Sequence, residues 1–452
     1  MIRRLVILGA SGDLTARYLV PALAALLARG DLPDGFTIIG MARTDWDSAR
    51  FRRAMEIALT EHAPHLDAAA REAVTNTMTY HRGDATSVPD LRTALQPADE
   101  PAVVYLALSP AIVGATLRAL IEATLPDGSR VVVEKPFGES LRSAQELNEL
   151  LHEALPESAI FRVDHFLAEQ AVQNVLGLRF ANRMLEPLWE REHIERVEIV
   201  WDETLALEGR AGYYDSAGAL RDMIQSHLLQ VLCFIAMEPP SSLNERDLRD
   251  RKVELLRAVR RLTPDEVGSN TVRARYTRGQ IGDRSVPSYV EEEGVDPVRR
   301  TETFAQVDLR IDNDRWTGVP FVLRSGKALR SDRFEIAVYF RAVTHPPFGG
   351  STAAVGNVLR LRFEPADVTF SLTTNATGDL GALHALDVTG SLPALDLPPY
   401  SRLILDILRG ANDLSIRDDE AEESWRIVEP ILDAWSTGRS PLREYPAGKH
   451  LS

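Results

Sequence analysis

The sequence predicts an α/β protein in two domains: a Rossmann-type domain, followed by an α+β domain with a large antiparallel sheet. In the first part of the chain, short β-branched runs alternate with amphipathic segments. After about residue 165, strand-like runs follow one another without intervening helices. A glycine-containing turn at 9–14 joins the first strand-like run to the first helical one. These patterns divide the chain into residues 1–164 and 165–452.

The first domain is predicted to hold a mostly parallel sheet. Its strand-like runs are bounded by turn residues and are separated by helical patterns, which is the order of βαβ units. The expected strands are 5–8, 36–40, 102–108 and 130–136, and the expected helices include 19–30 and 111–123.

The second domain begins with helical patterns at 171–192 and 215–238. Strand-like runs such as IERVEIVWDE (194–203) and FEIAVYFRAV (334–343) follow. Consecutive strands of this kind favour an antiparallel sheet. The stretch 277–300 is rich in Gly, Pro and charged residues and is predicted to be a surface loop.

Composition excludes several classes of protein. The 452 residues carry a net charge of −15, which argues against binding to nucleic acids or to anionic membranes. No apolar run approaches the roughly 18 residues that a membrane span needs. The single cysteine, Cys233, lies among apolar neighbours and fits a reducing, cytoplasmic setting. The ten histidines form no cluster with metal-ligand spacing, so no metal site is expected.

The turn GASGDL (9–14) has the features of a nucleotide site. Gly9 and Gly12 allow a tight turn and close backbone approach to a pyrophosphate at a helix N-terminus. Such a turn also occurs where no nucleotide binds. The candidate cofactor-binding residues here are Gly9, Ser11, Gly12, Asp13 and Leu14.

The second strand refines the choice of cofactor. Sites selective for NAD usually place an acidic residue at the end of this strand, whereas this chain has Arg43 and Thr44 there. A guanidinium favours a 2′-phosphate, so NADP is the expected cofactor. The alternative is that Arg43 is an ordinary surface arginine.

Further motifs extend along the chain. In order, the motifs are GASGDL (9–14), EKPFG (134–138), RVDHFL (162–167), QNVLGLRFAN (173–182), EGRAGYYD (208–215), GALRDMIQSHLLQVL (218–232), TETFA (301–305), GVPFVLRSGKAL (318–329) and SWRIVEP (424–430). With these motifs, the sequence resembles the glucose-6-phosphate dehydrogenase family over nearly its whole length. The resemblance implies a Rossmann-type domain, an α+β domain whose sheet also forms a homodimer interface, and oxidation of a hexopyranose at the anomeric carbon by NADP to a lactone.

Oxidation of a hemiacetal needs a base that takes the hydroxyl proton while hydride leaves the same carbon. An imidazole suits this task. The resemblance implies that His227 is the base and that Asp164 orients it. By itself, a histidine on a helix is more often structural. Lys135 of EKPFG matches a family lysine that reaches both the substrate and the nicotinamide.

The same resemblance implies a set of substrate-binding residues. An ordinary helix salt bridge is the alternative for Asp222. The implied residues are His165, Phe166, Glu203, Asp222 and Lys327.

Two positions depart from the family pattern. Glu169 stands where the family has a phosphate-binding lysine, and Asp332 stands where it commonly has a lysine or arginine. Losing a charge-assisted hydrogen bond costs about 1.5–3 kcal/mol, and a like charge at about 4 Å adds about 1–4 kcal/mol. We therefore expect a hexose without the 6-phosphate, either unphosphorylated or amino-bearing.

Two other readings stay open. Another cation (Arg17, Arg330 or Arg333) could replace the lost lysine, which would leave an ordinary glucose-6-phosphate 1-dehydrogenase of the pentose phosphate pathway. A catalytically silent regulatory paralogue is the third reading, and the retained His227, Asp164 and Lys135 count against it.

Overall fold

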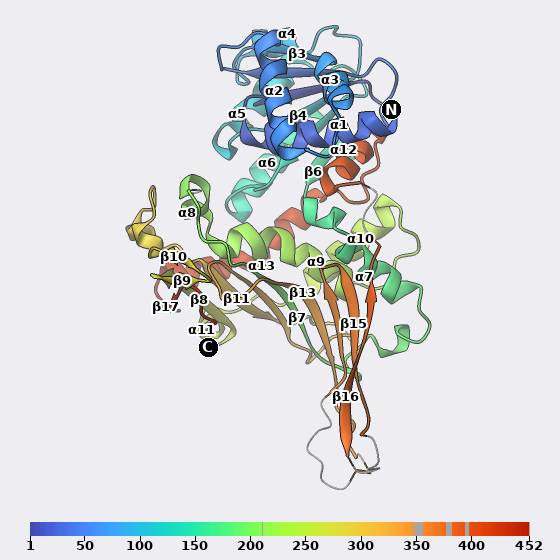
Figure 1. Ribbon diagram of the computed structural model, residues 1–452, viewed down its shortest axis with the longest axis vertical. Coiled ribbons are helices and arrows are strands. Elements are labelled where there is room, and N and C mark those ends of the chain that lie inside the picture. Colours follow the sequence, from blue (N-terminus) through green and yellow to red (C-terminus); the bar gives the residue numbers. More distant parts are fainter. Residues whose placement is uncertain (210, 346, 349–355, 377–381, 394–396, 452) are drawn as a thin grey trace. The chain divides into compact units, whose positions relative to one another are not determined.

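The computed structural model describes residues 1–209, 211–345, 347–348, 356–376, 382–393 and 397–451. The chain forms two compact units (Figure 1): unit 1 comprises Met1–Ala168, Ser241–Arg249 and Leu395–Glu422, and unit 2 comprises Glu169–Pro240, Asp250–Ala394 and Glu423–Ser452. This division differs from a single boundary at residue 164, because two later segments of the chain pack with the N-terminal part.

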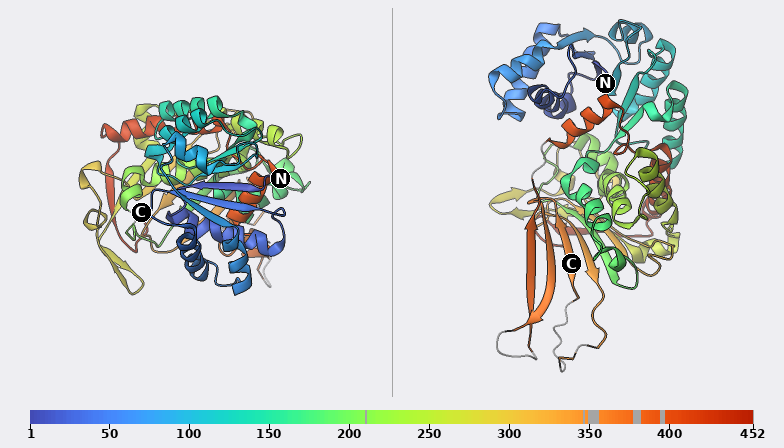
Figure 2. Two further views of the ribbon diagram at one scale, coloured as in Figure 1. Left: turned by 90° about the horizontal axis from the view of Figure 1, so that it is seen from above. Right: turned by 90° about the vertical axis from the view of Figure 1, so that its right-hand side faces the viewer.

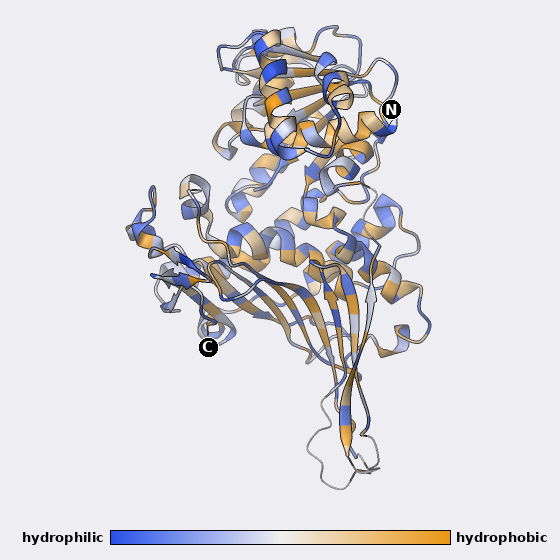
Figure 3. Ribbon diagram, in the orientation of Figure 1, coloured by the Kyte–Doolittle hydropathy of each residue, from blue (hydrophilic) through white to orange (hydrophobic). Residues whose placement is uncertain are grey.

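Unit 1 is built on a six-stranded parallel sheet with the order β3-β2-β1-β4-β5-β6. Its strands are largely buried and apolar, as Figure 3 shows. The strand order reverses beside β1, and a crevice at the carboxyl ends of the strands is where open α/β sheets bind ligands. The strands are β1 (Arg4–Leu8), β2 (Thr37–Ala42), β3 (Met78–Arg82), β4 (Val103–Leu106), β5 (Arg130–Glu134) and β6 (Ile160–Val163).

Helices cover both faces of this sheet (Figure 2, left). Side chains cap the N-termini of two of these helices. Asp47 accepts the Arg50 N–H at 2.7 Å at the start of α2, and Ser140 and Ser143 form a capping box at the start of α6. The elements are η1 (Thr15–Leu19), α1 (Val20–Arg29), α2 (Ser48–His62), α3 (Ala68–Asn76), α4 (Val88–Ala94), α5 (Pro110–Ala123), α6 (Leu141–Ala154), η2 (Glu157–Ala159), η3 (His165–Ala168) and α12 (Pro399–Arg409).

Unit 2 contains a nine-stranded sheet with the order β16-β15-β14-β13-β7-β12-β11-β8-β17. Most neighbours are antiparallel, as the sequence predicts, but β7 pairs with β12 in parallel and β8 pairs with β17 in parallel. A parallel pair needs a long crossover, and the helices between β7 and β12 provide one. The strands are β7 (Ile194–Asp202), β8 (Thr271–Thr277), β11 (Phe304–Leu309), β12 (Phe321–Gly326), β13 (Arg333–Phe340), β14 (Val358–Arg362), β15 (Asp367–Asn375), β16 (Leu383–Ser391) and β17 (Leu442–Pro446).

Helices of unit 2 gather on one face of this sheet in Figures 1 and 2. The helix predicted at 171–192 ends at Phe180, and the one predicted at 215–238 is α8, a π-helical segment η5, and α9. The elements are α7 (Gln170–Phe180), η4 (Glu186–Leu188), α8 (Ala211–Ala219), η5 (Leu220–Leu228), α9 (Leu229–Ala236), α10 (Glu245–Ala258), α11 (Pro264–Asn270) and α13 (Asp418–Ser436), of which α10 and α13 begin in unit 1.

The stretch 277–300 is more ordered than a plain loop. It contains a short hairpin of β9 (Gly279–Ile281) and β10 (Arg284–Val286), followed by η6 (Tyr289–Glu291) and η7 (Pro297–Arg299). Among the described residues, none of the helices has the length and apolar character required to cross a bilayer.

Candidate active site

The glycine turn of unit 1 closes tightly at the carboxyl end of β1. Gly9 has φ of 91°, and a Cβ there would lie 2.1 Å from the Ala107 carbonyl oxygen. Gly12 donates its N–H to the Gly9 carbonyl at 2.9 Å, and the chain then enters η1. Only glycine fits at position 9, because a side chain there would meet the backbone just after β4. A tight glycine turn that leads into a helix is the usual setting for binding a phosphate.

The end of β2 lies beside this turn. The Ser11 and Thr44 hydroxyl oxygens are 2.8 Å apart, and the neighbouring Arg43 side chain is exposed. Asp45, the first acidic residue after β2, forms an ion pair with Arg82 at 2.8 Å. Gly12 and Asp13 are exposed, and Leu14 leads into η1. The glycine turn, the two hydroxyls and the exposed Arg43 guanidinium suit the phosphates of a dinucleotide.

Lys135 directly follows β5, and its peptide bond to Pro136 is cis. The preceding residue, Glu134, accepts hydrogen bonds from the Tyr105 hydroxyl, at 2.5 Å, and from the Tyr400 hydroxyl. Burial raises the pKa of Glu134 to about 7, while the Tyr105 hydrogen bond and the Lys135 charge act in the opposite direction. Sequence reasoning missed Glu134, although its place beside Lys135 was a signal.

A cavity of about 530 Å³ opens beside Lys135. Its walls come from the ends of β4 and β5 and from residues along α5 and α6. The lining residues include Leu106, Pro110, Glu134, Lys135, Pro136 and Ser140. In unit 1, Lys135 therefore faces a space large enough for a ring-sized group.

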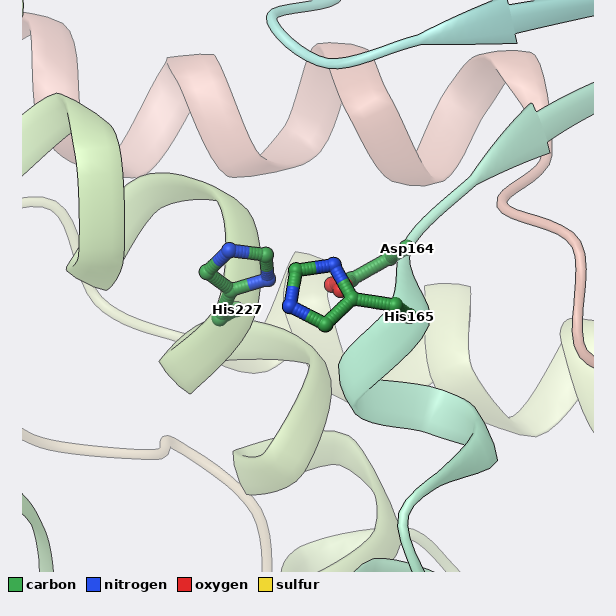
Figure 4. Close-up of side chains that lie close together, drawn as sticks. All are labelled: Asp164, His165 and His227. Carbon is green, nitrogen blue, oxygen red and sulfur yellow. The ribbon is translucent and has the colours of Figure 1, made fainter. Parts of the chain in front are cut away.

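A second group of candidate site residues in unit 1 lies directly after β6. Asp164 is buried and accepts the Phe166 N–H at 2.9 Å. The His165 ring is stacked on the Tyr400 ring, with centroids 5.7 Å apart and planes inclined by 18°. Phe166 is buried, which explains why an aromatic residue without a hydroxyl is tolerated there. Figure 4 shows Asp164 and His165 leaving adjacent positions at the end of this strand.

In unit 2, η5 carries both Asp222 and His227, and it packs against β11 and β12. His227 is buried on this helix, from which its side chain projects in Figure 4. Gly218, with φ of 69°, sets the start of η5, because a Cβ there would lie 2.4 Å from the carboxylate of Glu302. Glu302 accepts the Leu220 N–H at 3.1 Å. The π-helical hydrogen-bonding pattern of η5 extends over nine residues, and π-helical segments are frequent at functional sites.

Glu203 and Lys327 lie at one edge of the nine-stranded sheet. They follow β7 and β12, the parallel pair, so both emerge where the carboxyl ends of these strands meet. The Glu203 N–H donates to the Gly326 carbonyl at 2.8 Å, and the Lys327 ammonium forms an ion pair with the Glu203 carboxylate. The parallel pairing, which the sequence did not predict, therefore places these two side chains together.

The two residues that depart from the family pattern have defined surroundings in unit 2. Glu169 precedes α7, and burial, with the charge of Glu364 added, raises the pKa of Glu169 to about 7. Asp332 accepts the Thr204 N–H at 2.6 Å. The nearby cation Arg333 is engaged by two carboxylates, at 2.9 Å from Glu198 and 2.7 Å from Glu335.

One histidine cluster occurs in unit 1, where the sequence predicted none. His152 Nε2 lies 3.0 Å from the Glu157 carboxylate and 3.4 Å from the Asp418 carboxylate. Both carboxylates lie at hydrogen-bonding distance from the same ring nitrogen, and the three groups are also close enough together to share a metal ion.

The fold and these residues together define a nicotinamide-dependent oxidoreductase. Family models bear this out: the model described as "Glucose-6-phosphate dehydrogenase, NAD binding domain" matches residues 6–174. The model for the C-terminal domain of glucose-6-phosphate dehydrogenase matches residues 176–451. The chain belongs to the glucose-6-phosphate dehydrogenase family, and the resemblance seen in the sequence is confirmed.

Curated relatives match over nearly the whole chain. A glucose-6-phosphate 1-dehydrogenase of Treponema pallidum is 40% identical, covering 98% of this chain and 91% of the relative. That of Gluconobacter oxydans is 40% identical, covering 98% and 93%.

Solved structures agree with the curated relatives. A glucose-6-phosphate dehydrogenase in complex with its substrate glucose-6-phosphate has a TM-score of 0.89 at 33% identity, covering 100% of this chain and 96% of that one. A glucose-6-phosphate 1-dehydrogenase from Mycobacterium avium has a TM-score of 0.88 at 34% identity, covering 99% and 94%.

These relatives overturn the expectation of a hexose without the 6-phosphate, which is wrong. That expectation treated Glu169 and Asp332 as fully charged groups facing a phosphate. A carboxyl with a pKa of about 7 is largely neutral below that pH, so its repulsion of an anion is much weaker than assumed. The Asp332 carboxylate accepts a backbone N–H, which partly balances its charge.

Proposed function

We propose that this chain is a glucose-6-phosphate 1-dehydrogenase that oxidises glucose 6-phosphate at carbon 1 to the 6-phosphogluconolactone, with NADP as the cofactor. The observation that carries the proposal is the 40% identity over 98% of the chain to curated enzymes of that name. The retained His227, Asp164 and Lys135 supply the groups that the reaction needs.

The preference for NADP is supported by Arg43. Its exposed guanidinium follows β2, beside the Ser11–Thr44 contact, and no acidic residue precedes it at the strand end. A guanidinium can bind a 2′-phosphate with two hydrogen bonds, whereas it offers little to a ribose hydroxyl. The turn of Gly9, Ser11, Gly12, Asp13 and Leu14 would hold the pyrophosphate.

In the proposed mechanism, His227 takes the proton of the sugar's carbon-1 hydroxyl on an imidazole nitrogen. A nicotinamide cofactor held by the glycine turn and Arg43 would supply the hydride acceptor for the same carbon. Asp164 holds the imidazole in the required tautomer and stabilises the imidazolium that forms. Lys135 donates hydrogen bonds that orient the carbon-1 end of the sugar, and the cavity beside it supports this role.

Glu203, Asp222 and Lys327 would bind the sugar hydroxyls, since carboxylates accept and the ammonium donates hydrogen bonds. His165 and Phe166 would border the phosphate. We propose that Glu169, when protonated, donates its O–H to a phosphate oxygen; its raised pKa and its position before α7 support this assignment. Asp332 would hold the chain near the same end through its bond to Thr204.

We further propose a cytoplasmic homodimer. Cys233 is buried and is the single cysteine of the chain, so no intrachain disulfide can form, which suits a reducing compartment. Large apolar side chains on β15 and β16 are exposed in the single chain, namely Leu372, Leu386 and Val388. Association of two copies would remove such side chains from water.

The test is a steady-state assay with the purified chain, NADP and glucose 6-phosphate. The expected result is one NADPH per sugar oxidised, with 6-phosphogluconate as the product after lactone hydrolysis. Absence of NADPH formation at millimolar glucose 6-phosphate would refute the proposal.

A further inference from the structure

The candidate sugar-binding carboxylate Glu203 has an aromatic neighbour that the mechanism leaves without a role. Trp201 is the penultimate residue of β7 and is half-buried. Its indole Nε1–H donates to Glu203 Oε1 at 3.2 Å. The indole thus contacts the carboxylate itself, two residues along the strand.

The Trp201 ring is fixed by its packing. It stacks on Phe334 of β13, with ring centroids 4.3 Å apart and planes inclined by 27°, and Phe334 is its register partner. Phe363, just after β14, meets the same ring edge-on at 5.3 Å and 82°. Three strands of the sheet therefore determine where the indole N–H points.

The second oxygen of Glu203 is held from the other side. Lys327 forms its ion pair with Oε2, and its ammonium lies 5.2 Å from the centre of the Tyr214 ring. The terminal torsion of a glutamate is broad, so a single partner leaves the carboxylate free to rotate. Two partners on opposite oxygens fix its plane, and each oxygen keeps a lone pair for a sugar hydroxyl.

We infer that Trp201 is a positioning residue for substrate recognition: together with Lys327 it clamps the Glu203 carboxylate in the orientation that accepts a sugar hydroxyl. The inference rests on the proposed function. It assigns to Trp201 no contact with the reacting atoms, so its loss affects substrate binding and leaves the hydride-transfer step intact.

The decisive variant is Trp201→Phe, which keeps a ring for Phe334 and Phe363 and removes only the N–H donor. The expected result is a rise of about tenfold in KM for glucose 6-phosphate, the low end of what a hydrogen bond to a charged group contributes. The value of kcat stays within about twofold, and KM for NADP is unchanged. Phe363→Leu is the matched control, since it loosens the ring packing and retains the indole donor; its KM stays within about twofold.

A double-mutant cycle with Glu203→Gln separates positioning from general packing. Calorimetric binding of glucose 6-phosphate is measured for the wild type, both single variants and the double variant. With Glu203 replaced, the Trp201→Phe change is expected to add less than twofold. Additive effects, an unchanged KM in Trp201→Phe, or a loss confined to kcat would overturn the inference. If the wild type neither binds nor oxidises glucose 6-phosphate, the proposed function is refuted, and the inference with it. If the wild type is active and the Trp201→Phe variant is unaffected, the inference alone is overturned.

Discussion

At the residue scale, the protonation state of Glu169 decides whether this side chain repels a phosphate or donates a hydrogen bond to it. As a fixed negative charge it would oppose phosphate binding. As a partly buried carboxyl with a pKa raised to about 7, it carries a proton through much of the acidic and neutral range. In that form it is a hydrogen-bond donor, which an anionic substrate can use.

The first prediction concerns this titration. Because Glu169 ionises as the pH rises through about 7, the KM for glucose 6-phosphate is expected to increase about three- to tenfold from pH 6 to pH 8. Glu169→Gln stays neutral and keeps a donor, so its KM should vary with pH only through the titration of the phosphate itself. The ratio of the two KM values at each pH removes the contribution of the phosphate's own titration. An identical pH profile in both proteins would contradict this role.

The same shift has a consequence for stability. The folded-state pKa lies above the ordinary value of 4.5, so between about pH 4.5 and 7 the folded chain binds more protons than the unfolded chain at this group. The free energy of unfolding therefore falls as the pH rises through that window. Glu169→Gln should be more stable than the wild type at pH 8 by up to about 1–2 kcal/mol, after allowance for its partial exposure. Equal denaturant midpoints at pH 8 would count against the shifted pKa.

The second prediction concerns His227. Replacement by asparagine removes the base and retains a polar side chain on η5. Turnover is expected to fall by about 10²–10⁴-fold, the usual contribution of a general base. Binding of NADP, measured by fluorescence titration, should change less than twofold, because the glycine turn and Arg43 lie in unit 1. A variant with nearly wild-type kcat would show that another group is the base.

The third prediction concerns Arg43. Arg43→Ala should raise KM for NADP by at least about tenfold, since a charge-assisted hydrogen bond contributes about 1.5–3 kcal/mol. The KM for NAD should change less than about twofold, because NAD lacks the 2′-phosphate. Arg3→Ala is a suitable control, because Arg3 is an exposed arginine that precedes β1, at the end of the strand opposite the glycine turn. Equal losses for the two cofactors would contradict the assignment.

Some partners at this scale could not be predicted from the sequence. Tyr105 and Tyr400 both donate to Glu134, although they lie on β4 and at the start of α12, far apart in the chain. Only the return of 395–422 to unit 1 brings Tyr400 to this position. The roles proposed for His227 and Lys135 rest on sequence motifs, whereas these packed hydroxyls leave no local pattern in the sequence.

At the element scale, turns and strand ends determine where the functional groups lie. The turn after β1 could be predicted, because a strand, two glycines and a helix follow one another in the sequence. The parallel pairing of β7 with β12 could not be predicted, because strand-like runs that follow one another without helices between them favour antiparallel neighbours. Yet this pairing is what brings Glu203 to Lys327.

The fourth prediction tests the turn. Gly9→Ala places a Cβ 2.1 Å from a backbone oxygen, so the turn must distort and KM for NADP should rise by about tenfold or more. Gly30→Ala is the matched control: its φ of 73° carries the same left-handed strain, but no atom lies within 4 Å of the added Cβ. The control should lose about 1 kcal/mol of stability and keep its KM for NADP. Similar KM values in both variants would show that the turn does not approach the cofactor.

At the scale of the whole molecule, the two family models match residues 6–174 and 176–451, and the boundary at residue 164 stays a prediction. The packing of 241–249 and 395–422 with unit 1 was not visible in the sequence. These segments carry ordinary helical patterns, and their local composition does not indicate which unit they pack with. Their placement in unit 1 depends on contacts with residues that are distant in the sequence.

The fifth prediction concerns assembly. Light scattering coupled to gel filtration should give twice the 50.1 kDa of one chain. Leu386→Glu with Val388→Glu would bring charges onto exposed apolar positions of β16 and should shift the protein toward the single-chain mass. Leu243→Glu, at an exposed apolar position in unit 1, is the control and should leave the mass unchanged. A single-chain mass for the unaltered protein at micromolar concentration would contradict a homodimer.

The central claim is that this chain oxidises a phosphorylated hexose. Its most direct test is the ratio of kcat/KM for glucose 6-phosphate to that for glucose, with NADP at saturation and at pH 7. Two or more hydrogen bonds to the phosphate predict a ratio of at least about 100. A ratio near one, or higher efficiency with glucose or glucosamine, would contradict the account.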